Sequence, residues 1–320
     1  MQKITCRVPP LTKAAKLAGE ITKLPRLDHA IATSREGIAH KLTRAMIRKL
    51  IVAGAVYVNG KRMRIATKEM QGGEIIDIYY NSARAPETMS AEKFLPLRVL
   101  YEDNAVICFD KPPALPAHPT LDDTRANLFE LAKQQLSTQA GKAVYLGMHH
   151  RLDRDTSGVM LFTREEKHNA HVADQFKSHK CQKVYVAVVH GKLKQSSGKL
   201  ESFLGPVSKK GKQSKFGSVH AGGKKAITSY HVLSSTRDFS LVEVSIATGR
   251  THQIRVHLSE MGHPIVGDTL YGSPEKFFQK TKRHLLHAYA LSFEHPVTHG
   301  NVRVESPVPQ EFRKWVLEKP

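Results

Sequence analysis

The chain has 320 residues, and its 49 Lys and Arg residues against 29 Asp and Glu residues give a formal net charge of +20. This length favours two domains, and the charge predicts a polyanionic partner, either a phosphate backbone or an anionic surface. The most apolar stretch, residues 50–58, is short and is broken by Gly54, so we expect no membrane partner. The first 25 residues contain no apolar core typical of a secretory signal, so we expect a cytoplasmic protein.

The N-terminal part is predicted to be a basic extension over residues 1–25 followed by a small α+β domain over residues 26–80. A helix is expected over residues 42–53, then a strand over 55–58, a hairpin turn at Asn59-Gly60 and a second short strand. Four basic residues lie mostly off the apolar stripe of this helix and are candidate RNA-binding residues: Lys41, Arg44, Arg48 and Lys49. The alternative is a structural appendage whose charged face is only solvated.

Four segments of this small domain resemble the S4 RNA-binding domain over about fifty residues. They are Arg26-Leu27-Asp28, Thr43-Arg44-Ala45, residues 54–60 and Gly73-Glu74. The chain departs from the family in a longer stretch before the basic helix and in Thr43-Arg44, where the family often has Ser-Arg. The resemblance implies that this domain binds structured RNA.

Residues 81–94 lose periodicity and have the composition of a linker, so a second domain is expected over residues 95–320. Strand patterns lie at residues 99–101, 105–109, 158–163, 184–189, 226–233, 241–246, 285–293 and 302–304. Helical patterns lie at residues 165–179, 251–261 and 310–317. The helices are too few and too irregularly placed for βαβ winding, which predicts an α+β domain with a mixed, largely antiparallel sheet.

Residues 150–158, His-Arg-Leu-Asp-Arg-Asp-Thr-Ser-Gly, form a polar loop directly before an apolar strand, an arrangement that can hold a carboxylate rigidly at a cleft. The string resembles the HRLDxxTSG signature of the RluA-type pseudouridine synthases. Further segments match that family in the same order over about 200 residues: Lys111-Pro112 with His118-Pro119, residues 183–187, residues 248–257 and Leu286-His287-Ala288. The resemblance implies an enzyme that isomerises uridine to pseudouridine in RNA.

The resemblance also assigns roles at matching positions. Asp153 corresponds to the catalytic aspartate, whereas a loop cap or an ion pair with Arg154 is its structural alternative. Arg255 corresponds to the basic residue that pairs with this carboxylate, and a phosphate contact is the alternative. Arg250 is expected near the same cleft as an RNA-binding residue. Asp155 falls at a variable position and is expected to be dispensable.

Two more residues match the family's base-handling positions. Strand periodicity places Tyr185 on one face with Ala187 and Val189, where its ring has room to line a pocket, and the family stacks an aromatic ring on the target uracil here. Ordinary core packing is the alternative. Arg151 matches the residue that fills the gap left by the extruded nucleotide, with a phosphate contact as the alternative.

The implied reaction needs no atoms or electrons from outside, so we expect no cofactor. Asp153 has three chemical routes, attack at C1′, attack at C6 or removal of the 2′ proton. Large-subunit ribosomal RNA is the expected substrate because the S4-like domain accompanies ribosomal members of the family. The alternatives are transfer RNA as substrate and a non-catalytic RNA-binding ribosome-assembly factor, and we expect a monomer.

Two other features are open or unpromising. Residues 192–225 contain nine lysines and a single acid, which predicts a mobile basic loop that either grips RNA or is only solvated. The 18 histidines include the close pairs His168 with His171 and His252 with His257, and neither pair has an acid or thiol at a recognised metal-binding spacing. The three cysteines are scattered as well, so we expect no metal site.

Overall fold

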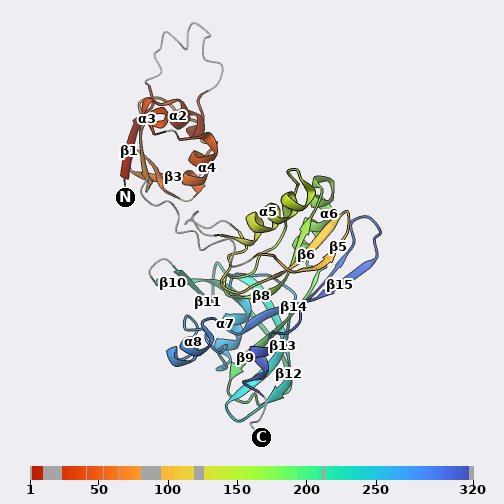
Figure 1. Ribbon diagram of the computed structural model, residues 1–320. Helices are drawn as coiled ribbons and strands as arrows, with labels where there is room; N and C mark the ends of the chain where they lie inside the picture. The colour runs from red at the N-terminus through yellow and green to blue at the C-terminus, as the bar shows by residue number, and fades with distance from the viewer. Residues whose placement is uncertain are drawn as a thin grey trace. The chain divides into compact units, whose positions relative to one another are not determined.

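The computed structural model describes residues 2–9, 24–40, 42–52, 54–63, 65–80, 95–118, 126–210 and 213–316. These residues divide into two compact units, one within residues 2–80 and the other, called here the catalytic unit, formed by residues 95–118 and 127–316 (Figure 1). The linker predicted over residues 81–94 lies outside the described residues. Among the described residues, no helix has the length and hydrophobicity that crossing a bilayer requires.

The smaller unit is an antiparallel sheet of strand order β1-β4-β2-β3 with one face buried against helices. Its elements are β1 (Gln2–Arg7), α2 (Leu27–Thr33), α3 (Arg35–Ala39), α4 (Arg44–Val52), β2 (Val56–Val58), β3 (Lys61–Met63) and β4 (Ile75–Tyr80). Alternation places Ile76 and Ile78 of β4 in the core, where they meet Ile47 and Ile51 of α4. Burial of these branched side chains is what holds the short helices on the sheet.

Two predictions for this unit have different outcomes. The Asn59-Gly60 hairpin is confirmed, because Val58 pairs with Lys61 and both turn residues have positive φ angles of 48° and 73°. The predicted extension over residues 1–25 is wrong for its first residues. Gln2–Arg7 is strand β1, paired with β4 from Gln2 opposite Tyr80 to Arg7 opposite Ile75, and therefore belongs to the domain.

The catalytic unit is built on an 11-stranded sheet with the order β11-β10-β12-β13-β9-β14-β8-β6-β5, to which β15 adds beside β14 and β7 beside β8. Its strands are β5 (Val99–Glu102), β6 (Val106–Lys111), β7 (Gly147–Met148), β8 (Ser157–Thr163), β9 (Gln182–His190), β10 (Ser197–Lys210), β11 (Gln213–Ser218), β12 (Lys224–Ser235), β13 (Phe239–Ile246), β14 (Leu286–Glu294) and β15 (Asn301–Glu305). Its helices are α5 (Leu128–Ala140), the 3-10 helix η2 (Glu166–His168), α6 (Asn169–Lys177), α7 (Gln253–Glu260), α8 (Glu275–Thr281) and α9 (Gln310–Arg313).

The pairing confirms the predicted mixed, largely antiparallel sheet. In the described residues β8 and β14 are parallel neighbours, and the other named pairs are antiparallel. The parallel pair is close at Gly158, whose φ is 115° and where an added Cβ would lie 2.1 Å from the carbonyl oxygen of Ala288. Glycine is therefore required where the loop of residues 150–157 enters β8. The loop thus reaches the centre of the sheet beside β14 and β9.

The mobile basic loop predicted over residues 192–225 is wrong for most of its length. Residues 197–210 and 213–218 are the antiparallel strands β10 and β11, which extend the sheet beyond β12. Leu204 of β10 and Phe216 of β11 pack in an apolar cluster with Val256 of α7. These apolar residues give the two strands a buried face, while Lys199 of β10 is exposed. Helix α7 contacts both β11 and β12 (Figure 1).

Candidate active site

The loop of residues 150–157 is anchored at its start by a neutral histidine. The Nε2 atom of His150 accepts the backbone N–H of Leu161 at 2.9 Å, and its ring stacks on Phe176 with centroids 4.5 Å apart. Burial, with the charges of Lys183 and His149, lowers the pKa of His150 to about 3. The imidazole is therefore uncharged at neutral pH, as acceptance of a hydrogen bond at Nε2 requires.

A buried ammonium group holds the same loop from behind. Lys111 at the end of β6 donates from Nζ to the carbonyl oxygens of Pro112 at 2.9 Å, Leu115 at 2.8 Å and Arg154 at 2.8 Å. Burial lowers the pKa of Lys111 to about 7, but three carbonyl acceptors match the three N–H bonds of the ammonium form. The peptide between Arg154 and Asp155 is thus fixed to the end of β6.

Asp153 is held from the front by an arginine fork. Arg255 of α7 is 8% exposed and donates from Nη1 to Oδ2 of Asp153 at 2.9 Å. The rest of the guanidinium is bound by the buried Asp268, to Oδ2 from Nε at 2.6 Å and to Oδ1 from Nη2 at 2.9 Å. Although burial opposes the charge, Asp268 and then Asp153 raise the pKa of Arg255. This bidentate pair fixes the plane of the fork.

A histidine approaches the same carboxylate oxygen. His252 has a left-handed backbone with φ of 56°, and its Nε2 lies 3.7 Å from Oδ2 of Asp153. Its Nδ1 is 2.9 Å from the hydroxyl of Tyr271, which accepts the N–H of Phe216 at 3.0 Å. Burial lowers the pKa of His252 more than Asp153 raises it. If the neutral imidazole of His252 carries its proton on Nε2, no nitrogen lone pair faces the carboxylate of Asp153. Nδ1 is then the acceptor, and the hydroxyl of Tyr271 donates to it.

Asp153, Arg255 and Tyr185 line one pocket, together with Arg151 and Arg250. Tyr185 of β9 is 9% exposed, and burial, followed by the negative charge of Asp153, raises its pKa. Its phenol is therefore neutral at physiological pH and presents an apolar ring to the pocket. The pocket combines a fixed carboxylate, an aromatic face and exposed or partly exposed arginines, a set suited to a planar base on a phosphate chain.

Two further residues considered in the sequence lie at the edge of this pocket or beside it. Arg250 donates from Nε to the carbonyl oxygen of Lys225 at 2.9 Å, which leaves it at the pocket edge. Asp155 is bound by Arg154 in a bidentate pair, with both contacts at 2.9 Å, and does not line the pocket. The two carboxylates of the motif are thus separated, one in the pocket and one paired beside it.

In the smaller unit, the predicted basic face is organised by a buried acid. Asp28 is fully buried, and its Oδ2 accepts from Nε of Arg48 at 2.6 Å and from Nε of Arg44 at 3.3 Å. Although burial opposes it, these bonds and the charge of Arg26 lower the pKa of Asp28. Lys41 and the side chain of Lys49 lie outside the described residues.

Sequence reasoning missed Asp268 and gave His252 no role beside the carboxylate. Asp268 follows α7 by eight residues and precedes Tyr271, within a segment that has neither helical nor strand periodicity. A buried arginine requires a counter-charge, which is the signal that a second acid must lie near Arg255. The sequence alone does not indicate which acid fills that place.

Known proteins are similar to this chain in sequence and in fold. Residues 105–260 match the family described as RNA pseudouridylate synthase. The Bacillus subtilis protein named uncharacterized RNA pseudouridine synthase YjbO is 32% identical over 263 residues, covering 82% of this chain and 90% of the relative. Ribosomal large subunit pseudouridine synthase D of Neisseria meningitidis serogroup A is 34% identical over 318 residues, 94% of this chain and 79% of the relative. The solved structure of human RNA Pseudouridylate Synthase Domain Containing 1 has a TM-score of 0.54 at 26% identity, covering 66% of this chain and 83% of that one.

The matched family and the sequence relatives define the class of this chain as an RNA-modifying isomerase. The chain belongs to the RNA pseudouridine synthase family, and within it to the RluA type.

Proposed function

We propose that this chain isomerises specific uridines of large-subunit ribosomal RNA, with Asp153 as the reactive carboxylate. The observation that carries the proposal is the position of Asp153 in a pocket with Tyr185, where the buried Arg255 binds one of its oxygens at 2.9 Å. The reaction breaks the N1–C1′ bond, turns the uracil and joins C5 to C1′. C5 then loses its proton and N1 gains one, so atoms and electrons balance without a cofactor. The ribosomal substrate is supported by the 34% identity to a relative named as a large-subunit enzyme.

The two oxygens of Asp153 have different surroundings. Arg255 and His252 both approach Oδ2, whereas Oδ1 accepts no hydrogen bond from the part of the chain that the structure describes. The side chain is 31% exposed, so Oδ1 is the oxygen that a nucleotide in the pocket can meet. Arg255 holds the carboxylate in one orientation, which a nucleophile or base needs.

Tyr185 and Arg151 supply the groups that extrusion of a nucleotide requires. A uridine has to leave the base stack before its glycosidic bond is accessible, at a cost of a few kcal/mol. Stacking on the buried ring of Tyr185 offsets part of that cost. Arg151 is exposed at the pocket edge, where its planar guanidinium can occupy the place of the departed base.

The test is the substitution Asp153→Asn, which keeps the shape of the side chain and removes its charge. We expect pseudouridine formation to be abolished while RNA affinity stays within a few-fold, because cations elsewhere dominate binding. Primer-extension mapping of ribosomal RNA from cells that lack the wild-type protein and carry each variant provides the measurement. Asp155→Asn is the matched control and should be nearly silent, since Asp155 is paired with Arg154 beside the pocket. Turnover by Asp153→Asn would remove Asp153 from its role.

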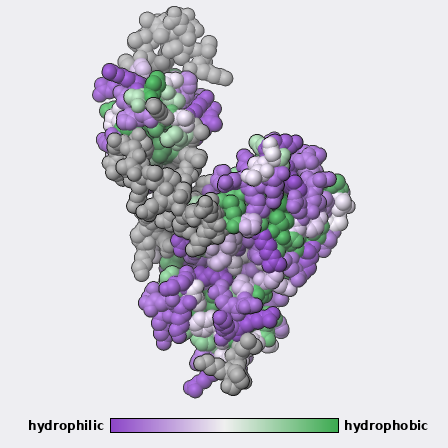
Figure 2. Space-filling model, viewed as in Figure 1, coloured by the Kyte–Doolittle hydropathy of each residue, from purple (hydrophilic) through white to green (hydrophobic). Residues whose placement is uncertain are grey.

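We also propose that the smaller unit is an S4-like RNA-binding module. Arg44 and Arg48 are each about half exposed, and Asp28 holds their Nε atoms so that the outer edges of both guanidinium groups share one surface. Arginines whose Nε atoms are already held in this way lose little side-chain entropy when they bind phosphates. Hydrophilic residues also cover most of the visible face of the catalytic unit (Figure 2), in keeping with an RNA-facing protein.

Transfer RNA as substrate and a non-catalytic assembly role are the two alternatives. Mapping both RNA classes in the same cells distinguishes them, because loss of modified positions in transfer RNA alone identifies the first. No change in either class identifies the second. We further propose that the chain acts as a monomer in the cytoplasm, where ribosomal RNA is the abundant substrate.

A further inference from the structure

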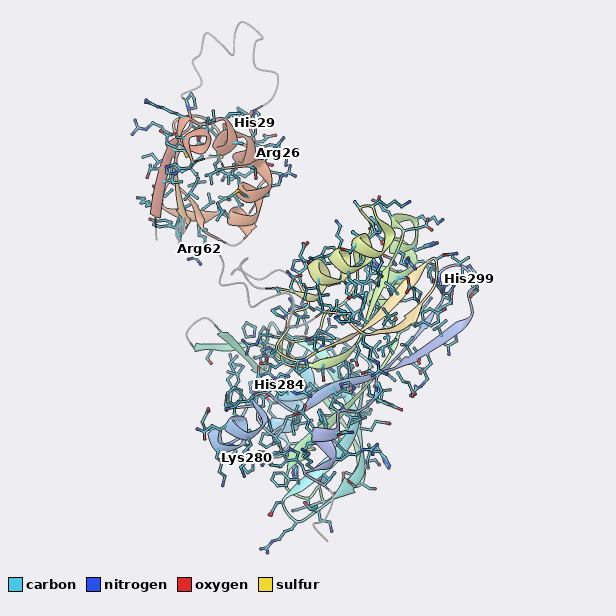
Figure 3. All side chains as sticks on the ribbon, in the orientation of Figure 1. Arg26, His29, Arg62, Lys280, His284 and His299 are labelled. Atoms are coloured by element: carbon cyan, nitrogen blue, oxygen red, sulfur yellow. The ribbon has the colours of Figure 1, made fainter. Side chains whose placement is uncertain are left out.

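Three side chains with metal-binding atoms meet at the outer end of the catalytic unit. His171 comes from α6, Glu294 is the last residue of β14, and His299 lies in the turn before β15. Their ligand atoms all lie within 4.8 Å of one another, with Oε1 of Glu294 3.3 Å from Nε2 of His171 and 2.9 Å from Nδ1 of His299. Figure 3 shows His299 at this outer turn, well apart from His284. His284 contacts the loop of residues 150–157, here called the motif loop, at Thr156.

A neighbouring side chain, independent of the contact between His171 and Glu294, places these two residues opposite each other. Gln175 lies one helical turn after His171 and is 4% exposed. It donates from Nε2 to the carbonyl oxygen of Glu294 at 2.9 Å and accepts the N–H of Glu294 at 2.8 Å. Because this amide pair fixes α6 to the end of β14, His171 and Glu294 are pre-positioned.

Hydrogen bonds within the turn before β15 fix the position of the third residue, His299, as well. His295 accepts at Nδ1 the N–H groups of Val297 at 3.3 Å and Thr298 at 3.1 Å, and its Nε2 lies 2.9 Å from Oδ2 of Asp103. The chain then turns back at His299, which has a left-handed φ of 55°. The imidazole of His299 is thereby directed towards Glu294 by the backbone of the turn.

The chemistry of the group is incomplete as it stands. Nε2 of His171 is buried and makes no hydrogen bond, although a carboxylate oxygen lies 3.3 Å away. We propose that His171, Glu294 and His299 bind a divalent transition-metal ion of the Zn²⁺ class. Two imidazole nitrogens and one carboxylate oxygen are a donor set that Zn²⁺ accepts, with water in the remaining position. Glu294 and His299 are 47% and 67% exposed in their side chains, so that position faces solvent.

A metal at this place would tie α6 to the β14–β15 turn, away from the reactive pocket, and its role is therefore structural. The partner of His171 is not His168, its neighbour in sequence, but two residues more than 120 positions further along the chain. The alternative explanation of the same geometry is an ion pair between protonated histidines and Glu294, without a metal.

The proposal is tested by calorimetric titration of the full chain, prepared without a polyhistidine tag, with ZnCl₂ at pH 7.5. We expect one saturable site in the wild-type protein. His171→Ala and His299→Ala should each weaken it by at least about 10-fold, the loss typical even of a residue that only supports a ligand. His231→Ala is the matched control, because His231 is an exposed histidine on β12 outside the group. Zinc should also raise the Tm of the wild type and of His231→Ala but not of the other two.

Absence of a saturable site in the wild type overturns the proposal and leaves the ion pair. Equal affinity in the wild type and in His171→Ala overturns it as well, because zinc is then held adventitiously by other histidines. If His171→Ala fails to fold, His299→Ala decides alone, since its side chain is mostly exposed. Binding by the wild type that both variants lose supports the site.

Discussion

Arg255 contacts the reactive carboxylate with one N–H group and gives two others to Asp268. A buried guanidinium with a single partner would be unstable, because its desolvation is repaid only when its donors are satisfied. Asp268, 1% exposed, satisfies Nε and Nη2 and leaves Nη1 for Asp153. The direction of the guanidinium group is thus set by a residue that does not line the pocket.

Asp268→Asn should therefore lower both stability and turnover while leaving RNA affinity unchanged. The amide replaces one acceptor by a donor that faces Arg255, and breaking a buried pair costs about 3 kcal/mol. We expect a lower free energy of unfolding in urea and a slower single-turnover rate with RNA in excess of Kd. An unchanged rate in a destabilised variant would mean that Asp268 supports the fold but does not position Arg255.

His150 makes the motif loop sensitive to acid. Its folded pKa of about 3 lies below the ordinary value of ~6.5 expected in the unfolded chain. Between those pH values the unfolded chain binds a proton that the folded chain does not, so stability is lost as the pH falls from about 6.5 towards 3. His150→Gln keeps an acceptor for the N–H of Leu161 and removes the titration.

Urea unfolding at pH 6.5 and pH 5 measures this effect. The wild type should lose at most about 2 kcal/mol more than His150→Gln over that interval, a value that follows from one proton and 1.5 pH units. The other histidines titrate alike in both proteins and cancel in the comparison. Equal losses would show that the proton is bound by folded His150, contrary to its role as an acceptor.

At the scale of elements, the close approach of β8 and β14 depends on Gly158. An Ala at this position has to adopt a φ of 115° and place its Cβ 2.1 Å from the carbonyl oxygen of Ala288. We expect Gly158→Ala to separate the parallel pair, with a much lower Tm and no detectable turnover. Gly141→Ala is the control, because Gly141 also has positive φ, 65°, but an added Cβ there meets nothing within 4 Å.

The control should cost only about 1 kcal/mol, the usual penalty for replacing Gly at a left-handed helix end. Thermal unfolding followed by circular dichroism measures the Tm of both variants. A similar decrease in Tm in the two would show that the positive φ, and not the contact with Ala288, causes the loss of stability.

The elements that were predicted have a local cause in the sequence, whereas two of the strands that were missed do not. Strands such as β9 and β14 were predicted because apolar runs and alternation are visible along the chain. Strands β10 and β11 were missed because their lysines hide a buried face that only pairing with β12 creates. Helix α5 was missed although its signals are local, with the side chain of Asn127 capping Glu130 N and Gly141 ending the helix.

The site divides in the same way. Asp153, Arg255 and Tyr185 were found because the motifs that carry them can be recognised in the sequence, and the structure brings them to one pocket. Asp268 was missed because its partner Arg255 lies in another element. The contact between His171 and Glu294, away from the pocket, was missed for the same reason. Tertiary contacts of this kind leave no periodic trace in the sequence.

At the scale of the whole molecule, we propose that one compact unit recognises RNA and the other carries out the chemistry. The pocket that contains Asp153 is built from β9, β14, α7 and the loop before β8, all within the catalytic unit. The arginines organised by Asp28 are within residues 2–80. Each unit has its own cluster of buried hydrophobic residues, so we expect the catalytic unit to fold without the smaller one.

Deleting residues 1–80 should therefore leave a folded, soluble catalytic unit that binds its RNA more weakly. Each phosphate that the protein no longer neutralises reduces the steepness of log Kobs against log salt by about 0.9. Filter binding of ribosomal RNA at several salt concentrations should give a weaker and less salt-dependent affinity for the fragment, while its rate with saturating RNA falls far less. Aggregation of the fragment would place the domain boundary elsewhere. Binding as tight and as salt-dependent as that of the full chain would show that the arginines around Asp28 do not bind RNA.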